Sequence, residues 1–176
     1  LINIGPHTTF YDIATTSDPT WAANVILNGP PSYAEVRNEH VSCASILKLT
    51  GKVALFNLTI VHKISVEGLI LTNSGFWIEN CDFNSAALAG ASTSLYLNGS
   101  AAIIVHGLVR NCMFMGGVYT KAIHLNQATM VHFDRVEIDT ALIGIHIVDA
   151  DSDRNIFHEI DIGDCGVGMD IDGGNE

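Results

Sequence analysis

Ile123-His124-Leu125-Asn126-Gln127 and Ile145-His146-Ile147-Val148-Asp149 lie 22 residues apart and share one pattern, in which two apolar residues flank a single position. The pattern occurs seven times, at 25–29, 47–51, 69–73, 95–99, 123–127, 145–149 and 169–173. Counted at the second apolar residue, the steps are 22, 22, 26, 28, 22 and 24 residues. A period in this range, carried by strand-like alternation, predicts a solenoid of stacked coils. We therefore expect about seven coils.

A second motif recurs about half a coil away from the first. Its five copies are Leu58-Thr59-Ile60, Cys81-Asp82-Phe83, Cys112-Met113-Phe114, Val136-Glu137-Ile138 and Ile160-Asp161-Ile162. The alternation is that of a strand with one buried face. Three residues before each copy lies another apolar residue, and this odd offset predicts a bend in the strand between the two. Each coil should therefore contain at least two strand faces joined by a corner, and a third face formed by the first motif.

Composition limits the class of protein. The chain has 176 residues, of which 48% are hydrophobic and 15% charged, so it can form one domain with a sizeable core. No apolar run reaches the roughly 18 residues of a membrane-spanning helix. The formal charge of −11 disfavours binding to nucleic acid, because acidic surfaces repel phosphates.

The coils are expected at residues 41–176, after a capping region with the first coil at residues 1–40. Within that region, Asp18-Pro19-Thr20-Trp21 fits the start of a short capping helix. The last copy of the motif is followed by no cap-like sequence, and an open end coil would expose apolar side chains and unpaired backbone groups. We expect either a longer polypeptide or a stack closed by a partner.

The four cysteines are Cys43, Cys81, Cys112 and Cys165. Cys81 and Cys112 hold the same position in successive coils and should point inward as free thiols, where cysteine behaves as a small hydrophobe. No Cys-x-x-Cys pair or zinc-ligand spacing is present, so we expect no metal and no cofactor.

The outward positions of the first motif give the first candidate site. From coil to coil they are Ile26, Lys48, Ile70, Tyr96, His124, His146 and Asp170. Neighbouring coils lie about 4.8 Å apart, so Tyr96, His124, His146 and Asp170 should form one outward patch. Histidine beside carboxylate can support acid–base chemistry or hold a metal, and we take the four residues as a candidate binding site. Aromatic residues are also simply favoured on strands, which leaves a structural role open.

The second motif places Glu137 and Asp161 outward on adjacent coils. Two carboxylates at this spacing are what glycoside hydrolysis requires, so both residues are candidate catalytic groups. A solvated acidic surface is the alternative, and Arg135 could neutralise it.

Three segments, residues 78–83, 109–114 and 155–169, resemble the right-handed parallel β-helix proteins of the pectin-lyase-like superfamily, including phage tailspikes. The resemblance covers roughly residues 45–176 and implies a right-handed parallel β-helix. It also implies asparagine ladders at corners, for which Asn57, Asn80 and Asn111 form one column and Asn98 and Asn126 another. The Asn-Thr-Asp, Gly-His-Gly and Arg-Ile-Lys signatures of the superfamily's polygalacturonases do not occur in this chain.

The resemblance favours a structural or receptor-binding module of a virion appendage, a homotrimer that contacts glycans at the virion surface or outside the cell. A polysaccharide lyase or glycoside hydrolase and a bacterial surface adhesin are the alternatives. Whether the chain is an enzyme stays open, since fold specifies activity poorly.

Overall fold

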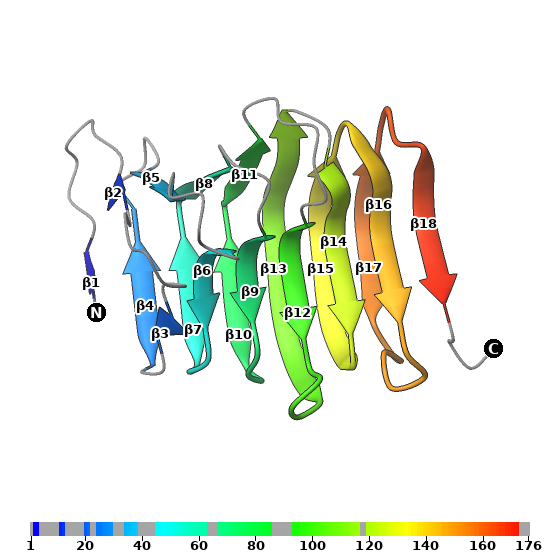
Figure 1. Cartoon of the computed structure of the whole chain (residues 1–176), viewed down its shortest axis with the longest axis horizontal. Helices are drawn as coiled ribbons and strands as arrows, with labels where there is room; N and C mark the ends of the chain where they lie inside the picture. The colour runs from blue at the N-terminus through cyan, green and yellow to red at the C-terminus, as the bar shows by residue number, and fades with distance from the viewer. Residues whose placement is uncertain are drawn as a thin grey trace.

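The computed structural model describes residues 2–3, 11–12, 20–21, 24–29, 34–38, 45–62, 67–85, 93–116 and 119–172. All of its regular elements are strands, shown in Figure 1. They are β1 (Ile2–Asn3), β2 (Tyr11–Asp12), β3 (Thr20–Trp21), β4 (Val25–Asn28), β5 (Ala34–Asn38), β6 (Ser45–Leu49), β7 (Val53–Phe56), β8 (Leu58–His62), β9 (Glu67–Leu71), β10 (Phe76–Glu79), β11 (Asp82–Ser85), β12 (Thr93–Asn98), β13 (Ile104–Gly116), β14 (Tyr119–Asn126), β15 (Ala128–Ile138), β16 (Ala141–Val148), β17 (Ile156–Ile162) and β18 (Val167–Asp172). No helix in these described ranges has the length and apolar character that a membrane crossing requires.

The strands form two parallel sheets. Sheet A contains β1, β4, β7, β10, β13, β11, β8, β5 and β2, with β15 and β17 continuing from β13, and sheet B runs β18-β16-β14-β12-β9-β6-β3. In Figure 1 the strands of sheet B point down at the front and most of those of sheet A point up behind, while the chain advances from left to right. The coil is therefore right-handed. The fold is an all-β parallel β-helix, as the repeat predicted.

The stack has about five turns rather than the expected seven. Five turns are described over nearly their whole length, and they begin at β7, β10, β13, β15 and β17. Earlier in the chain, β1, β2 and β3 have only two residues each. One copy of the first motif was also assigned to the wrong sheet. Val25–Asn28 pairs with β7 in sheet A, and Trp21 is the register partner of Leu49 in sheet B. Apolar alternation is the same on every buried strand, so the motif alone could not distinguish the sheets.

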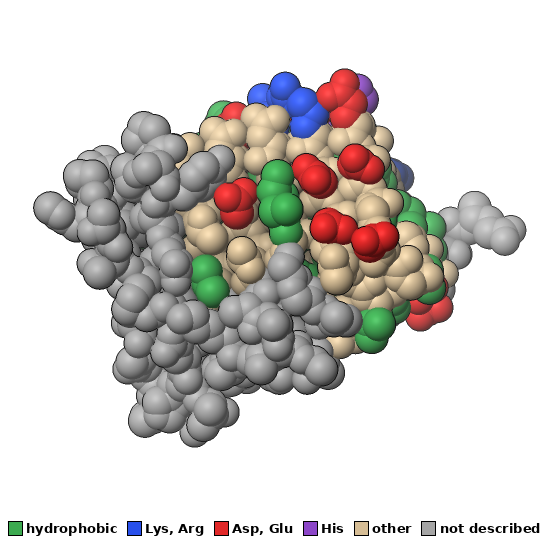
Figure 2. Space-filling view, turned by 90° about the horizontal axis from the view of Figure 1, so that it is seen from above, with side chains coloured by type: hydrophobic (Ala, Val, Ile, Leu, Met, Phe, Trp, Pro, Cys, Tyr) green, Lys and Arg blue, Asp and Glu red, His purple; other side chains and the backbone are tan. Residues whose placement is uncertain are grey.

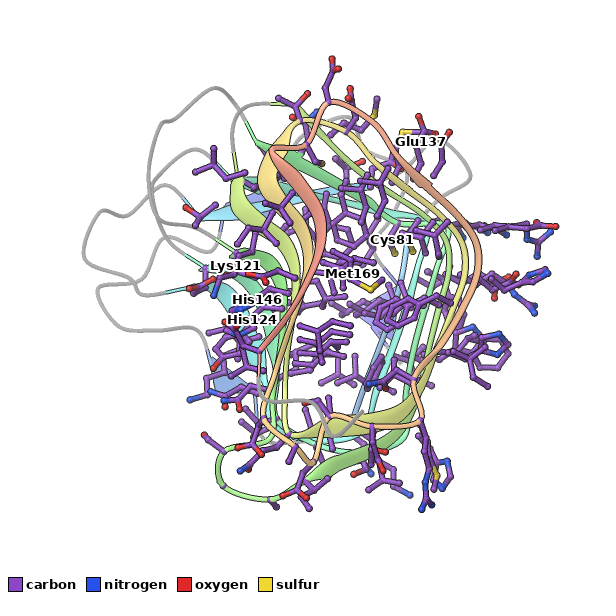
Figure 3. The ribbon with its side chains drawn as sticks, turned by 90° about the vertical axis from the view of Figure 1, so that its right-hand side faces the viewer. Cys81, Lys121, His124, Glu137, His146 and Met169 are labelled. Atoms are coloured by element: carbon purple, nitrogen blue, oxygen red, sulfur yellow. The ribbon has the colours of Figure 1, made fainter. Side chains whose placement is uncertain are left out.

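The core is a set of columns that run along the coil axis. Leu55, Ile78, Val109 and Phe133 are each fully buried and are register partners from coil to coil. Aromatic rings continue the stacking, with Phe83 and Phe114 at 4.5 Å and Phe133 and Phe157 at 5.1 Å between ring centroids. The side chains inside the coil in Figure 3 are these columns seen end-on. Their burial is the main favourable contribution to stability.

The bend predicted between the two faces of sheet A is a left-handed backbone corner. Asn57, Asn80, Asn111, Arg135 and Glu159 occupy it with φ of 56°, 53°, 48°, 54° and 51°. Asparagine tolerates this conformation better than most residues. Its side chains also form the expected ladder: Asn80 Nδ2 donates to Asn57 Oδ1 at 3.3 Å, and Asn111 Nδ2 donates to Asn80 Oδ1 at 3.2 Å.

The second asparagine column differs from the expectation. Asn98 and Asn126 are register partners, but the Asn126 side chain donates to the Tyr96 hydroxyl at 3.3 Å. The predicted capping helix at Asp18-Pro19-Thr20-Trp21 is wrong for its last two residues, because Thr20–Trp21 is strand β3 and pairs with β6. Residues 13–19 and Cys43 lie outside the described ranges.

Cys81 and Cys112 are buried free cysteines on neighbouring coils, as expected. Burial raises the pKa of the Cys112 thiol well above its usual value, which keeps the thiol protonated and unreactive. Cys165 is also free and is partly exposed.

Candidate functional site

The first candidate site forms a continuous stack on sheet B. Register pairs join Tyr96 to His124, His124 to His146, and His146 to Asp170. The Tyr96 and His124 rings lie 4.6 Å apart and nearly parallel, and the His124 and His146 rings lie 5.0 Å apart. Figure 3 shows both histidines on the outer side of the sheet, opposite Met169 inside the coil. The predicted stacking of these four residues is therefore confirmed. The predicted start of the column is wrong, because Ile26 lies in sheet A beside Ala54.

The side chains of this stack are less exposed to solvent than an outward patch should be. His146 is 8% exposed, and His124 and Tyr96 are intermediate. Burial, with smaller contributions from the charges of Lys121 and His146, lowers the pKa of His124 to about 4. The Nε2 of His124 and the Nδ1 of His146 are buried without a hydrogen-bond partner in the described structure. A neutral, stacked His124 stabilises the sheet and is poorly placed to exchange protons with solvent.

His146 faces two carboxylates on the next strand. Its Nε2 lies 3.1 Å from Asp172 Oδ2 and 3.8 Å from Asp170 Oδ2, close enough for a shared cation. A metal-bound imidazole normally donates a hydrogen bond from its other nitrogen, and Nδ1 of His146 has no acceptor among the described residues. The geometry therefore favours a hydrogen bond between His146 and Asp172 over a metal centre.

Glu137 and Asp161 are register partners on β15 and β17, and both are exposed. Figure 3 places Glu137 on the outside of the coil, and Figure 2 shows acidic side chains gathered over the C-terminal half of one face. Neither residue lines the two grooves described below. The adjacency that glycoside hydrolysis needs is present.

A surface that sequence reasoning missed runs along the outward side of sheet A. We call it the apolar row, and register pairs define it as Ile26, Ala54, Trp77, Leu108, His132 and Ile156. Trp77 is 44% exposed, Ile26 43% and Ile156 55%. The signal was present in the sequence, because these residues directly precede the buried column of Leu55, Ile78 and their equivalents. The exposed apolar side chains in this line make the row a candidate interaction surface.

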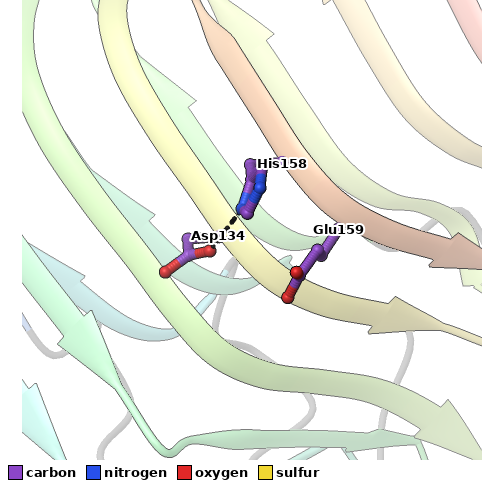
Figure 4. A group of neighbouring side chains, drawn as sticks. All are labelled: Asp134, His158 and Glu159. Atoms are coloured by element: carbon purple, nitrogen blue, oxygen red, sulfur yellow. Dashed lines mark hydrogen bonds and ion pairs between the residues drawn. The ribbon is translucent and has the colours of Figure 1, made fainter.

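Beside it lies a charged row, formed by Phe56, Glu79, Arg110, Asp134 and His158. Asp134 is its centre: Arg110 Nε lies 2.9 Å from Oδ2, and His158 Nδ1 lies 2.9 Å from Oδ1 (Figure 4). Arg135 Nη2 approaches Oδ2 at 3.4 Å. Because two guanidinium groups and an imidazole already surround the carboxylate, Asp134, His158 and Glu159 form an ion-pair network rather than a cation site.

The network shifts the pKa values of its members in opposite directions. The hydrogen bond from His158 is the main cause of the lowered pKa of Asp134, with Arg110 and Arg135 adding to it. The same hydrogen bond raises the pKa of His158. Each partner thus favours the charged form of the other.

Trp77, a member of the apolar row, contacts two residues of the charged row. Its Nε1–H donates to Glu79 Oε2 at 3.0 Å, and its ring meets Phe56 edge-on with centroids 5.7 Å apart. Shallow grooves lie on both sides of it. One, of about 350 Å³, includes His106, Leu108 and Met130, and the other, of about 390 Å³, includes Ile26 and Lys52. Trp77 and Gly75 line both, so the indole forms a ridge between two grooves.

No protein-family model matches the chain, and no curated protein or solved structure resembles it at a significant level. The fold and the site together define a parallel β-solenoid with an aromatic ridge on one flat face.

Proposed function

We propose that the chain is a carbohydrate-recognition β-solenoid whose binding surface is centred on Trp77. The observation that carries the proposal is an exposed indole with fixed orientation, flanked by two grooves on a flat parallel sheet. Solenoids commonly bind along such extended faces, because the coil repeats recognition positions along one axis.

The chemistry of the ridge fits a sugar ring. Pyranose rings have an apolar face of C–H groups that packs against an indole, while their hydroxyl groups need nearby donors and acceptors. Trp77 supplies the apolar plane, and the neighbouring charged row supplies Glu79 and Arg110. Sites with a mostly apolar lining and a few placed polar groups are typical of small-ligand recognition. Because Trp77 is already oriented by Glu79 and Phe56, binding would cost little side-chain entropy.

The shape of the surface favours a chain-like glycan over a single sugar. Grooves lie on both sides of the indole along the coil axis, and both rows continue from β7 to β17. A linear oligosaccharide could therefore occupy both grooves with one ring stacked on Trp77. The formal charge of −11 favours neutral over acidic glycans.

The biological setting that we propose is a virion appendage related in style to the pectin-lyase-like tailspikes, at the virion surface or outside the cell. The support for this setting is the solenoid fold together with a glycan-binding face. A homotrimer belongs to the same proposal. A bacterial surface adhesin would use the same face and is the alternative setting.

The binding proposal is tested on a panel of immobilised neutral and acidic oligosaccharides. We expect binding to at least one neutral glycan and a loss of at least tenfold in affinity for Trp77→Ala. Trp77→Phe should retain most of the affinity, because it keeps a flat ring. Leu142→Ala is the matched control, since Leu142 is 55% exposed and lies outside both rows.

Unfolding curves of all three variants establish that they are folded. Unchanged glycan binding by folded Trp77→Ala would refute the site, and absence of binding across the panel would refute the function.

A hydrolase is the second candidate, because Glu137 and Asp161 are adjacent on neighbouring coils. Its test is cleavage of whichever glycan binds. Cleavage that persists in the double variant Glu137→Ala/Asp161→Ala would remove this pair from the reaction.

A further inference from the structure

We propose, on the basis of the carbohydrate-binding function proposed above, that Arg110 determines the specificity of that site by binding two adjacent hydroxyl groups of the sugar ring stacked on Trp77. The ligand class is a neutral β-1,4-linked glycan whose internal rings carry free hydroxyl groups at both C2 and C3. The position of Arg110 beside the indole and the way in which its guanidinium is anchored carry the inference.

Arg110 and Glu79 lie at one edge of the indole. They are register partners in the charged row, two residues beyond Leu108 and Trp77, which are register partners in the apolar row. Neighbouring strands are about 4.8 Å apart, so the four positions form a compact square on the sheet. Gly75, which lines both grooves, lies two residues before Trp77 on the opposite side. A sugar ring on Trp77 therefore has one edge over the grooves and the other beside Glu79 and Arg110.

The guanidinium of Arg110 is anchored through one of its three nitrogens. Nε donates to Asp134 Oδ2 at 2.9 Å, and among the described residues Nη1 and Nη2 have no hydrogen-bond partner. Asp134 is itself fixed, because its side chain is only 10% exposed and its carboxylate also contacts His158 and Arg135. The Arg110 side chain is 37% exposed, so its two Nη groups are presented to solvent as a preorganised fork of N–H donors.

The polar groups at this edge match a pair of adjacent hydroxyl groups. The two Nη groups of one guanidinium can donate to two neighbouring oxygens at once, which the single ammonium of lysine does not reproduce. The hydroxyl hydrogens need an acceptor, and the Glu79 carboxylate supplies it, already oriented by the Trp77 Nε1–H. In a β-1,4-linked glucan or xylan the ring hydroxyls are equatorial, so C–H groups cover both ring faces and the C2–C3 diol points outward in the ring plane. Such a ring can stack on the indole and present its diol to Arg110.

Charge favours a diol over a carboxylate at this fork. Arg110 lies between Glu79 on one neighbouring strand and Asp134 on the other, so acidic groups flank the guanidinium on both sides. A carboxylate ligand would meet both of these acids and the formal charge of −11, which opposes its binding. A neutral hydroxyl pair accepts the same hydrogen bonds without this repulsion.

Binding of the whole chain to four hexasaccharides tests the proposal. Cellohexaose and xylohexaose carry the C2–C3 diol on their internal rings, whereas chitohexaose has an acetamido group at C2. Cellohexaose oxidised to carboxylates at C6 keeps the diol and adds negative charge. We expect cellohexaose and xylohexaose to bind at least tenfold more tightly than chitohexaose, and the oxidised ligand to bind no more tightly than cellohexaose.

Two variants assign the preference to the fork. Arg110→Lys keeps the charge and loses the bidentate geometry, so it should lower the affinity for cellohexaose at least tenfold and leave that for chitohexaose unchanged. Asp134 is a positioning residue, and Asp134→Asn should reduce the ratio of the two affinities, which a loss of stability alone would not change. Arg154→Lys is the matched control, because Arg154 is 71% exposed and lies outside both rows. Urea unfolding establishes that each variant is folded.

A preference for cellohexaose that survives in folded Arg110→Lys would overturn the proposal. Tighter binding of the oxidised ligand would also overturn it, because the fork would then be a carboxylate site. Loss of binding in Trp77→Ala would leave the carbohydrate function standing in both cases. Binding of other neutral glycans without cellohexaose or xylohexaose would refute the diol pattern alone, whereas absence of all glycan binding would refute the function itself.

Discussion

At the residue scale, Asp134 shows how a solenoid converts sequence distance into contact. Arg110 and His158 each lie 24 residues from it, and both make 2.9 Å contacts with its carboxylate. The carboxylate is 10% exposed, while the imidazole of His158 is 61% exposed. Because both partners titrate and their pKa values shift in opposite directions, the contribution of the pair to stability should fall at both low and high pH.

We expect this contribution to be complete between roughly pH 4 and pH 6.5, the ordinary pKa values of the two groups. The lowered pKa of Asp134 means that its stabilisation is present above its ordinary pKa and is lost as pH falls through the folded value. The raised pKa of His158 means that its stabilisation is lost as pH rises through the folded value.

Urea unfolding at a series of pH values tests this expectation. In a plot of the free energy of unfolding against pH, Asp134→Asn should reduce the slope on both the acidic and the alkaline side relative to the wild type. Asp164→Asn serves as control, because Asp164 is exposed. A variant curve parallel to that of the wild type would contradict the expectation.

At the element scale, the corner between the two faces of sheet A combines backbone conformation with a side-chain ladder. Asn80 has φ of 53° and makes ladder hydrogen bonds to both Asn57 and Asn111. Two effects are therefore superimposed at one residue: tolerance of the left-handed conformation and hydrogen bonding along the coil axis.

Two substitutions separate these effects. Asn80→Gly keeps the conformation accessible and removes the hydrogen bonds, at a cost of about 1 kcal/mol or somewhat more. Asn80→Ala should cost about 1–2 kcal/mol beyond that, because an alanine Cβ is strained there. The free energy of unfolding in urea measures both. Equal losses for the two variants would show that backbone conformation contributes little.

At the scale of the whole molecule, stability is a sum over coils and the contacts between neighbours. A residue inside the stack is covered on two sides, whereas an equivalent residue at the end is covered on one. Phe133 is fully buried, and its stacking partner Phe157 on the last described coil is only partly buried.

Phe133→Ala should therefore destabilise the protein by about 3–5 kcal/mol, the usual cost of a buried phenylalanine. Phe157→Ala should cost distinctly less, since its ring is already partly in water. Denaturant unfolding of both variants gives the comparison. A larger loss for Phe157→Ala would imply that another element covers this end in solution.

The sequence by itself determined the coil. The spacing of Leu97, Leu125 and Ile147 required stacked strands, and the odd offset before Cys81 and Cys112 required a bend. It also predicted that Tyr96, His124, His146 and Asp170 would stack, because a period of one coil fixes neighbours without further information. Apolar alternation did not assign Val25–Asn28 to a sheet, since a buried strand has the same alternation wherever it pairs.

Only the tertiary structure decided which surfaces can act. Burial of His146, the fixed orientation of Trp77 and the grooves beside it depend on contacts between coils, and alternation within a strand carries no record of them. The same holds at the end of the stack. Met169 and Ile171 obey the core pattern as closely as Ile145 and Ile147, and they are exposed because none of the described strands pairs with the far side of β18.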